Sequence, residues 1–118
     1  KIWKEAQEIA QENNTNMQWS SNVKDIVSNA DVVYTDVWVS MGCEQESEER
    51  KRVLSPYQVT ANILQAAKPD ALFMHCMPTH PGEEVSRSVL ASPQANLFDQ
   101  AENRLHIQKA ILRQLTQS

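Results

Sequence analysis

The chain has 118 residues, of which 41% are hydrophobic and 22% charged, and its formal net charge is −4. This length suits one domain with a buried core, and the composition excludes a disordered, collagen-like or coiled-coil chain. The acidic balance argues against a nucleic-acid partner or an anionic membrane surface, because both require a basic face. The apolar runs are also too short to span a bilayer.

The two cysteines, Cys43 and Cys76, are too few for a secreted disulfide scaffold, so we expect a cytoplasmic location. The sequence contains neither a CxxC nor an HExxH pattern, and no metal site is predicted. Only two glycines occur, so the chain lacks a glycine-rich phosphate loop. No cofactor is expected.

The hydrophobic spacing predicts a series of helices and short strands. Apolar residues at helical spacing indicate a first helix, and a serine followed by proline marks the start of another. Asp99 is expected to cap the last helix, with Glu102 in the capping-box position. The predicted helices cover residues 1–13, 21–29, 44–54, 55–67, 83–90 and 99 onward, and the predicted strands cover residues 17–20, 32–35, 71–74 and 95–98.

Short apolar strands that alternate with helices are typical of a parallel sheet covered on both sides. We therefore predict the α/β class, with a Rossmann-like doubly wound parallel sheet and helices on both faces. Such a domain usually opens on a strand, whereas this chain opens on a helix. The sequence thus resembles one domain, residues 1–118, that lacks its first strand.

Ligands of such sheets bind at the carboxyl ends of the strands, and three stretches of this chain fall there. Asp36 follows the second predicted strand, and its carboxylate could hold a substrate ammonium group or cap a turn. Ser40 and Met41 follow, either as binding groups or as parts of a plain turn. Residues 44–52 are charge-dense and indicate a solvated helix, although they could also form a mobile lid.

The next stretch at the strand ends is His75-Cys76-Met77-Pro78. A thiol beside an imidazolium loses its proton readily and can act as a nucleophile or proton acceptor. The alternative is a buried, inert cysteine. Pro78 directly after a strand allows a cis peptide bond that turns a backbone carbonyl toward the pocket. His80 could face the site, but a surface position is favoured.

Arg104 lies about one turn into the last predicted helix, whose N-terminus faces the same edge of the sheet. A guanidinium there suits a phosphate or a carboxylate. The alternative is an ion pair with Glu102 or Asp99.

Together these three stretches resemble the ornithine carbamoyltransferases. Asp36 to Gly42 is similar to the family's D-x-x-x-S-M-G motif, and His75 to Pro78 is similar to its H-C-L-P motif, with Met77 in place of leucine. Phe98 to Arg104 reads F-D-Q-A-E-N-R, as in the family. The motifs occur in family order and spacing, and the resemblance covers nearly the whole chain.

The resemblance implies the C-terminal, ornithine-binding domain of an enzyme that converts carbamoyl phosphate and L-ornithine into L-citrulline and phosphate, in arginine biosynthesis or the arginine deiminase pathway. It implies that Asp36, Ser40 and Met41 hold the amino-acid end of ornithine and that Cys76 accepts a proton from the attacking amine. Met77 would contribute its carbonyl. His75 and Arg104 would contact carbamoyl phosphate, His75 at the carbamoyl oxygen. The family enzyme is a trimer, so a homo-oligomer is expected.

Two departures from the family pattern limit these expectations. Pro81 replaces a frequent arginine, and any contact of that arginine is lost. The S-T-R-T and H-P-T-Q motifs, with which the family binds carbamoyl phosphate, do not occur in this sequence. We therefore expect the chain alone to be inactive. The alternative is a non-enzymatic module that binds an amino acid or mediates oligomerisation.

Overall fold

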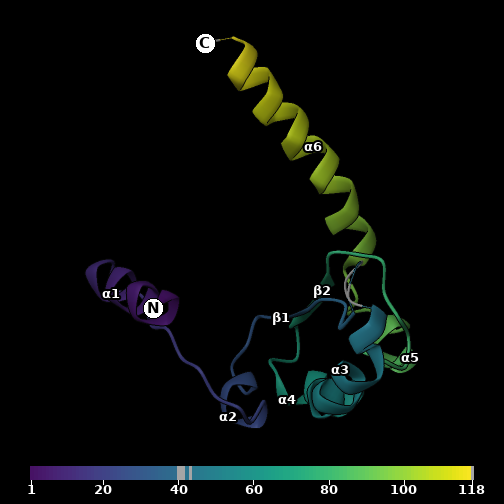
Figure 1. Ribbon diagram of the computed structural model, residues 1–118. Helices are drawn as coiled ribbons and strands as arrows, with labels where there is room; N and C mark the ends of the chain where they lie inside the picture. Colours follow the sequence, from purple (N-terminus) through teal and green to yellow (C-terminus); the bar gives the residue numbers. More distant parts are fainter. Residues whose placement is uncertain (40–41, 43, 118) are drawn as a thin grey trace.

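Two short parallel strands lie at the centre of the computed structural model, which describes residues 1–39, 42 and 44–117. Helix α1 and most of helix α6 stand clear of the remaining elements (Figure 1). The elements are α1 Ile2–Glu12, α2 Lys24–Val27, β1 Val32–Thr35, η1 Glu44–Glu46, α3 Ser47–Leu54, η2 Ser55–Tyr57, α4 Ala61–Ala66, β2 Leu72–His75, α5 Arg87–Leu90 and α6 Leu97–Thr116, where η denotes a 3-10 helix.

Strands β1 and β2 pair in parallel, with Val33 opposite Phe73 and Thr35 opposite His75. Because side chains alternate along a strand, these four residues share one face of the sheet. Phe73 and His75 on that face are fully buried. On the opposite face Tyr34 is 53% exposed. The structure therefore confirms the α/β class and the parallel sheet, and it places the main core on one face.

The core is formed by two clusters that meet at Val33. Apolar residues from α4, α5, the start of α6 and the segments that precede α4 and α5 surround Phe73 in the larger cluster: Val59, Leu64, Val85, Val89 and Leu97. The smaller cluster joins α2 to the segment before β2 through Val27, Ala67 and Ala71. These contacts fix both strands, and with them the strand ends that carry the candidate site.

Several predicted elements are confirmed. The first helix, the strand over residues 32–35 and the charge-dense helix over residues 44–54 appear at or near their predicted bounds. In α3 the acids Glu48 and Glu49 occupy the first turn and the bases Lys51 and Arg52 the last turn, which suits the helix dipole. Strand β2 begins one residue later than predicted.

Two predicted strands are wrong. Residues 17–20 adopt no regular secondary structure, and Trp19 is exposed, so no packed face supports a strand there. The segment 95–98 forms a single isolated bridge between Ala95 and Phe73, with Phe73 N–H bonded to the Gln94 carbonyl and Asn96 N–H to the Phe73 carbonyl. The segment then becomes helical because Leu97 is buried in the core and starts α6.

The predicted helices over residues 55–67 and 83–90 are both shorter than expected, because backbone groups of one segment pair with backbone groups of the other. The N–H of Val59 donates to the Glu84 carbonyl, and the N–H of Ser86 donates to the Val59 carbonyl. This pairing separates η2 from α4, where Thr60 accepts a capping bond from the N–H of Ile63. It also keeps residues 83–86 out of the helix predicted over residues 83–90.

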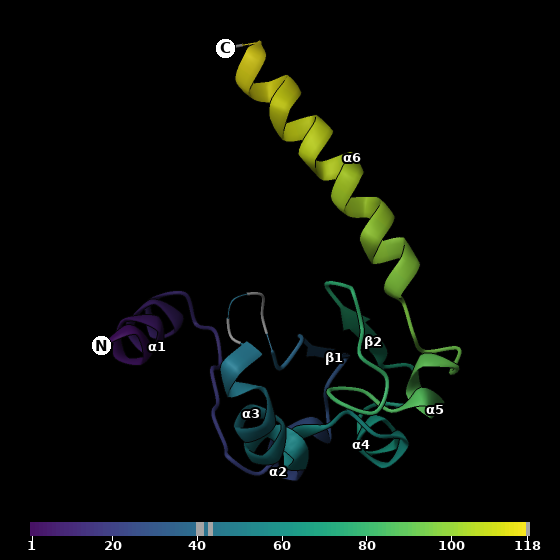
Figure 2. The same ribbon diagram turned by 45° about the vertical axis from the view of Figure 1, so that its right-hand side comes forward.

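The last helix begins at Leu97, two residues before the predicted cap. Asp99 lies in the first turn and is not the capping residue, and the described side chains form no capping box there. Its carboxylate still favours the positive end of the helix dipole. Most of α6 projects into solvent (Figure 2). No described helix has the length and apolar character needed to cross a membrane.

The two phenylalanines of the chain provide a matched test of this core. We expect Phe73→Ala to lower the free energy of unfolding by about 3–5 kcal/mol, because Phe73 is fully buried and its removal leaves a cavity. The control Phe98→Ala removes a side chain that is 80% exposed and should change stability by less than about 0.5 kcal/mol. Denaturant unfolding of both variants checks the prediction, and equal losses would contradict this core assignment.

Candidate functional site

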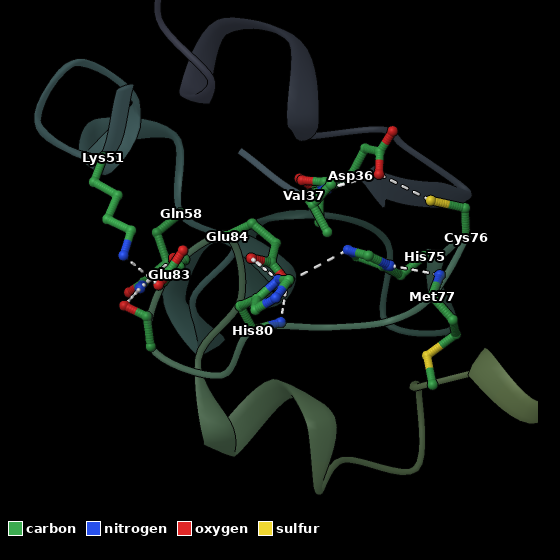
Figure 3. Close-up of polar contacts among 12 residues, drawn as sticks. Asp36, Val37, Lys51, Gln58, His75, Cys76, Met77, His80, Glu83 and Glu84 are labelled. Carbon is green, nitrogen blue, oxygen red and sulfur yellow. Dashed lines mark hydrogen bonds and ion pairs between the residues drawn. The ribbon is translucent and has the colours of Figure 1, made fainter. Parts of the chain in front are cut away.

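The parallel pairing of β1 and β2 brings Asp36 and Cys76 into contact. Thr35 and His75 are partners at the ends of the strands, so the next residue of each strand leaves the sheet at the same edge. The Cys76 thiol donates a hydrogen bond to Asp36 Oδ1, with Sγ and Oδ1 2.9 Å apart (Figure 3). The same carboxylate oxygen accepts the N–H of Val37 at 2.7 Å. A carboxylate and a thiol thus share the open edge of the sheet.

This contact shifts the two pKa values in opposite directions. The hydrogen bond from Cys76, with that from the N–H of Val37, lowers the pKa of Asp36. The Asp36 carboxylate raises the pKa of Cys76, first through the hydrogen bond and further through its negative charge, and partial burial acts in the same direction. At neutral pH the site therefore holds a carboxylate beside a protonated thiol, and not the thiolate that a neighbouring imidazolium would favour.

His75 faces away from the thiol and into the protein. Its side chain is fully buried, and its ring extends toward Glu84 (Figure 3). Nδ1 accepts the N–H of Met77 at 2.8 Å, so the proton of a neutral ring is on Nε2, which lies 3.4 Å from Glu84 Oε1. The ring therefore lies in the interior, and its contact with a carbamoyl oxygen stays a prediction from the sequence.

The backbone after Cys76 turns sharply. Met77 has a positive φ of 60°, which is uncommon for a residue other than glycine, and the Met77–Pro78 peptide bond is cis. The hydrogen bond from the Met77 N–H to the His75 ring supports this conformation. The buried histidine therefore holds the loop that carries the thiol.

The far side of this loop is fixed by Glu84, which is fully buried. Glu84 Oε1 accepts the backbone N–H of His80 at 2.5 Å. The His80 side chain is half exposed, in line with the surface position favoured by the sequence. Glu83, next to Glu84, forms an ion pair of 2.8 Å with Lys51 of α3 (Figure 3). This ion pair connects the charge-dense helix to the segment that contains Glu84.

The structure adds Gln100 and Tyr34 to the site, and neither was singled out from the sequence. Gln100, in the first turn of α6, accepts the backbone N–H of His75 at 2.9 Å and donates to the Tyr34 hydroxyl at 3.3 Å. Tyr34 acts against Asp36 and lowers the pKa of Cys76, without reversing the net upward shift. A sequence signal existed for both: Gln100 lies four residues before Arg104, on the same side of the helix, and Tyr34 alternates with the half-buried Val33.

Arg104 is exposed on α6, and no ion pair joins it to another residue of the described chain. Glu102, one of its two expected partners, pairs instead with His106 at 3.2 Å. Because Gln100 faces the strand ends, Arg104 lies one helical turn further along the same side of α6.

Ser40 and Met41 lie outside the described residues. Gly42 is described, and its φ of 89° suits glycine.

The chain is similar to known proteins over nearly its whole length. The family model for the aspartate/ornithine carbamoyltransferase Asp/Orn binding domain matches residues 1–115. An ornithine carbamoyltransferase of Methanosphaera stadtmanae is 51% identical over 112 residues, which cover 95% of this chain and 37% of that protein. The chain thus spans little more than a third of the length of this relative.

Solved structures show the same likeness. The ornithine carbamoyltransferase of Pyrococcus furiosus has a TM-score of 0.79 at 50% identity, over 87% of this chain and 33% of that one. The anabolic enzyme of Campylobacter jejuni has a TM-score of 0.90 at 32% identity, over 98% of this chain and 38% of that one. With a matching family model over nearly its whole length, this chain belongs to the aspartate/ornithine carbamoyltransferase family and corresponds to its Asp/Orn binding domain.

Proposed function

We propose that this chain forms the ornithine-binding half of the active site of an ornithine carbamoyltransferase. The reaction is transfer of the carbamoyl group of carbamoyl phosphate to L-ornithine, which yields L-citrulline and phosphate. The observation that carries the proposal is the 2.9 Å contact between Asp36 and Cys76, two residues that stand in two separate family motifs. We also propose that the working enzyme is a homo-oligomer, a trimer by family resemblance.

In this proposal Asp36 binds the ammonium group at the amino-acid end of ornithine. Its lowered pKa keeps the carboxylate ionised, and an ionised acceptor makes the stronger hydrogen bond to an ammonium group. Ser40 and Met41 are proposed to complete this contact because they stand in the same D-x-x-x-S-M-G motif. A preference for ornithine over putrescine, which has no carboxylate at that end, is proposed from the match to the D-x-x-x-S-M-G motif.

Cys76 is proposed to accept the proton released by the attacking amine. In the reaction the side-chain nitrogen of ornithine forms a bond to the carbamoyl carbon, the bond from that carbon to the phosphate oxygen breaks, and the nitrogen loses a proton. The resting thiol is protonated because Asp36 raises its pKa. An ammonium group bound to Asp36 offsets that carboxylate charge, so that the thiol releases its proton to solvent more easily and the resulting thiolate can accept the proton of the amine. Ornithine would thereby prepare its own proton acceptor.

The remaining groups act on carbamoyl phosphate or hold the loop. We propose that the Met77 carbonyl orients the attacking amine and that Arg104 contacts carbamoyl phosphate, where its guanidinium stabilises the charge that develops during transfer. For His75 we propose a supporting role, because its buried ring holds the N–H of Met77. A cytoplasmic location is proposed from the low cysteine content.

We further propose that the chain alone does not catalyse the reaction. Arg104 by itself is a weak site for a phosphate dianion, and the S-T-R-T and H-P-T-Q motifs are missing from these residues. A second candidate function is an amino-acid-binding or oligomerisation module without catalysis. The exposed apolar residues of α6, among them Leu105, Ile107 and Leu112, favour at least a partner surface.

Calorimetric titration tests the ornithine site directly. We expect the chain to bind L-ornithine and to bind putrescine and N-acetyl-L-ornithine more weakly. Asp36→Asn should weaken ornithine binding about tenfold or more, because it removes the charge from a charge-assisted hydrogen bond. Asp70→Asn, at an exposed aspartate outside the site, is the control. Equal binding of ornithine and putrescine by a folded chain would refute the proposed specificity.

Alkylation kinetics test the state of the thiol. In a Cys43→Ser background Cys76 is the single cysteine, and its alkylation rate against pH reports its pKa. Asp36→Asn should lower this pKa and speed alkylation several-fold at a fixed pH below it, because removal of a negative neighbour favours the thiolate. Saturating ornithine should shift the pKa of the unsubstituted thiol in the same direction. A pKa that does not respond to Asp36→Asn would rule out the proposed coupling.

Complementation tests catalysis. The chain is mixed with the separately expressed carbamoyl-phosphate-binding domain of a family enzyme, and citrulline formation is measured. Cys76→Ala and Arg104→Ala should each lower the restored rate by about a hundredfold or more, as expected for loss of a proton acceptor or a charge-stabilising donor. Arg113→Ala, in the last turn of the same helix, should retain the rate. Full activity of both site variants would overturn the assigned roles.

A further inference from the structure

Two polar side chains hold residues 82–86 against the charge-dense helix and the turn that follows it. The amide nitrogen of Gln58 donates to the Gly82 carbonyl at 2.8 Å and to the Glu83 carbonyl at 2.6 Å. The ammonium group of Lys51, in α3, pairs with the Glu83 carboxylate at 2.8 Å (Figure 3). Lys51 and Gln58 together therefore form a clamp on this segment.

The chemistry of the two contacts makes them specific. An amide nitrogen can only donate, so both hydrogens of the Gln58 amide serve the two carbonyls. The side chains of Lys51 and Glu83 are 37% and 30% exposed, so salt screens their ion pair less than a pair in open solvent. Glu83 also raises the pKa of Lys51 through this hydrogen bond, and the ammonium group stays charged at neutral pH.

The clamped segment carries Glu84, the side chain that fixes the loop of the thiol. The Glu84 carbonyl accepts the N–H of Val59, next to the clamp. Its carboxylate accepts the N–H of His80 and lies 3.4 Å from Nε2 of His75, whose Nδ1 accepts the N–H of Met77. The clamp thus holds the segment from which Glu84 reaches both ends of the loop over residues 75–80.

The same helix is connected to the other motif of the site. The 3-10 helix η1 and helix α3 come directly after the D-x-x-x-S-M-G motif in sequence. Asp36, the first residue of that motif, contacts Cys76 at 2.9 Å. The two motifs are therefore joined twice, once directly at Asp36 and Cys76, and once through α3 and the clamp.

We propose that Lys51 and Gln58 are positioning residues that act through residues 82–86 and Glu84 to keep the Cys76 thiol against Asp36. Without the clamp this segment relies on its backbone hydrogen bonds, and the loop opens more often. Opening separates the thiol from the carboxylate that opposes its ionisation, so the thiolate forms more easily. The value of the clamp for catalysis rests on the proposed function, in which Cys76 accepts a proton beside ornithine.

Alkylation kinetics against pH, in the 118-residue chain carrying Cys43→Ser, report both the accessibility and the pKa of Cys76. Gln58→Met removes the donor and should speed alkylation by about three- to tenfold at a fixed pH below the thiol pKa. Lys51→Met should speed it by about two- to fivefold, because a partly exposed ion pair contributes less. The thiol pKa should fall in both variants. An unchanged rate in either one would overturn the proposal.

Matched variants separate the clamp from a general loosening of the fold. Lys51→Arg keeps the charge and should keep the parent rate. Arg52→Met breaks the 2.7 Å pair with Glu49 inside α3 and should also keep it. Val27→Ala removes buried methyl groups from the smaller core cluster, so it should lower stability and leave the thiol pKa unchanged. Shifts in Arg52→Met or Val27→Ala as large as those of the clamp variants would contradict the proposal.

A double-mutant cycle tests whether Lys51 acts through Glu83. Glu83→Gln should speed alkylation as much as Lys51→Met, and the double variant should be no faster than either single variant. Additive effects would refute this route. The cycle also decides the question if Gln58→Met fails to fold, because it alters only a partly exposed pair. Denaturant unfolding of each variant shows which of them are folded.

Ornithine titration of the parent chain distinguishes the clamp from the proposed function. If the clamp variants speed alkylation as expected and the folded parent chain does not bind ornithine, the clamp stands and the proposed function fails. If ornithine binds and the clamp variants react at the parent rate, the proposed function stands and the role of Lys51 and Gln58 is refuted. Where both hold, Lys51→Met and Gln58→Met should also weaken ornithine binding several-fold, since the thiol and Asp36 are no longer held together.

Discussion

The site depends first on the parallel register of β1 and β2. Because Thr35 and His75 are partners, Asp36 and Cys76 leave the sheet together, and the carboxylate and the thiol come within hydrogen-bond distance although 40 positions separate them in sequence. An antiparallel pair would place the residues after the two strands at opposite ends. The register is held by Phe73, whose buried side chain packs among α4, α5 and the start of α6. Packing in the core thus fixes which two side chains meet at the edge of the sheet.

A second constraint is that adjacent residues of a strand point their side chains in opposite directions. His75 and Cys76 are neighbours in sequence, yet one lies in the interior and the other at the edge, as alternation along a strand requires. The buried ring fixes the Met77 backbone, and the half-buried thiol contacts Asp36. The His75-Cys76 pair, which reads as two reactive side chains, therefore places a ring in the interior and a thiol beside Asp36. This explains why the Asp36 carboxylate, and not an imidazolium, sets the direction of the Cys76 pKa shift.

The sequence predicts the parts of the structure that are set locally or by chemistry. It identifies the helix at residues 1–13, the strand at residues 32–35 and the three stretches at the edge of the sheet. It fails where a distant partner decides the outcome. Val59 pairs with Val85, which breaks two predicted helices, and burial of Leu97 starts α6 before its expected cap. Gln100 was missed for a related reason, since its two partners lie on strands that are distant in sequence.

The placement of Arg104 follows from the first turn of α6 alone. Beyond Leu97 the helix has no buried residue, so its direction over the edge is set by the packing of Leu97 and by the contacts of Gln100. A rigid helix carries that alignment one turn outward to the guanidinium. Helix α6 therefore carries the Arg104 guanidinium outward, whereas the Cys76 thiol and the Asp36 carboxylate lie together at the strand ends. Such a separation of charges suits the proposed reaction, which binds an ammonium group at one end of the site and releases phosphate at the other. The contacts of the Gln100 amide with His75 and Tyr34 are therefore as important to this geometry as the charged groups themselves.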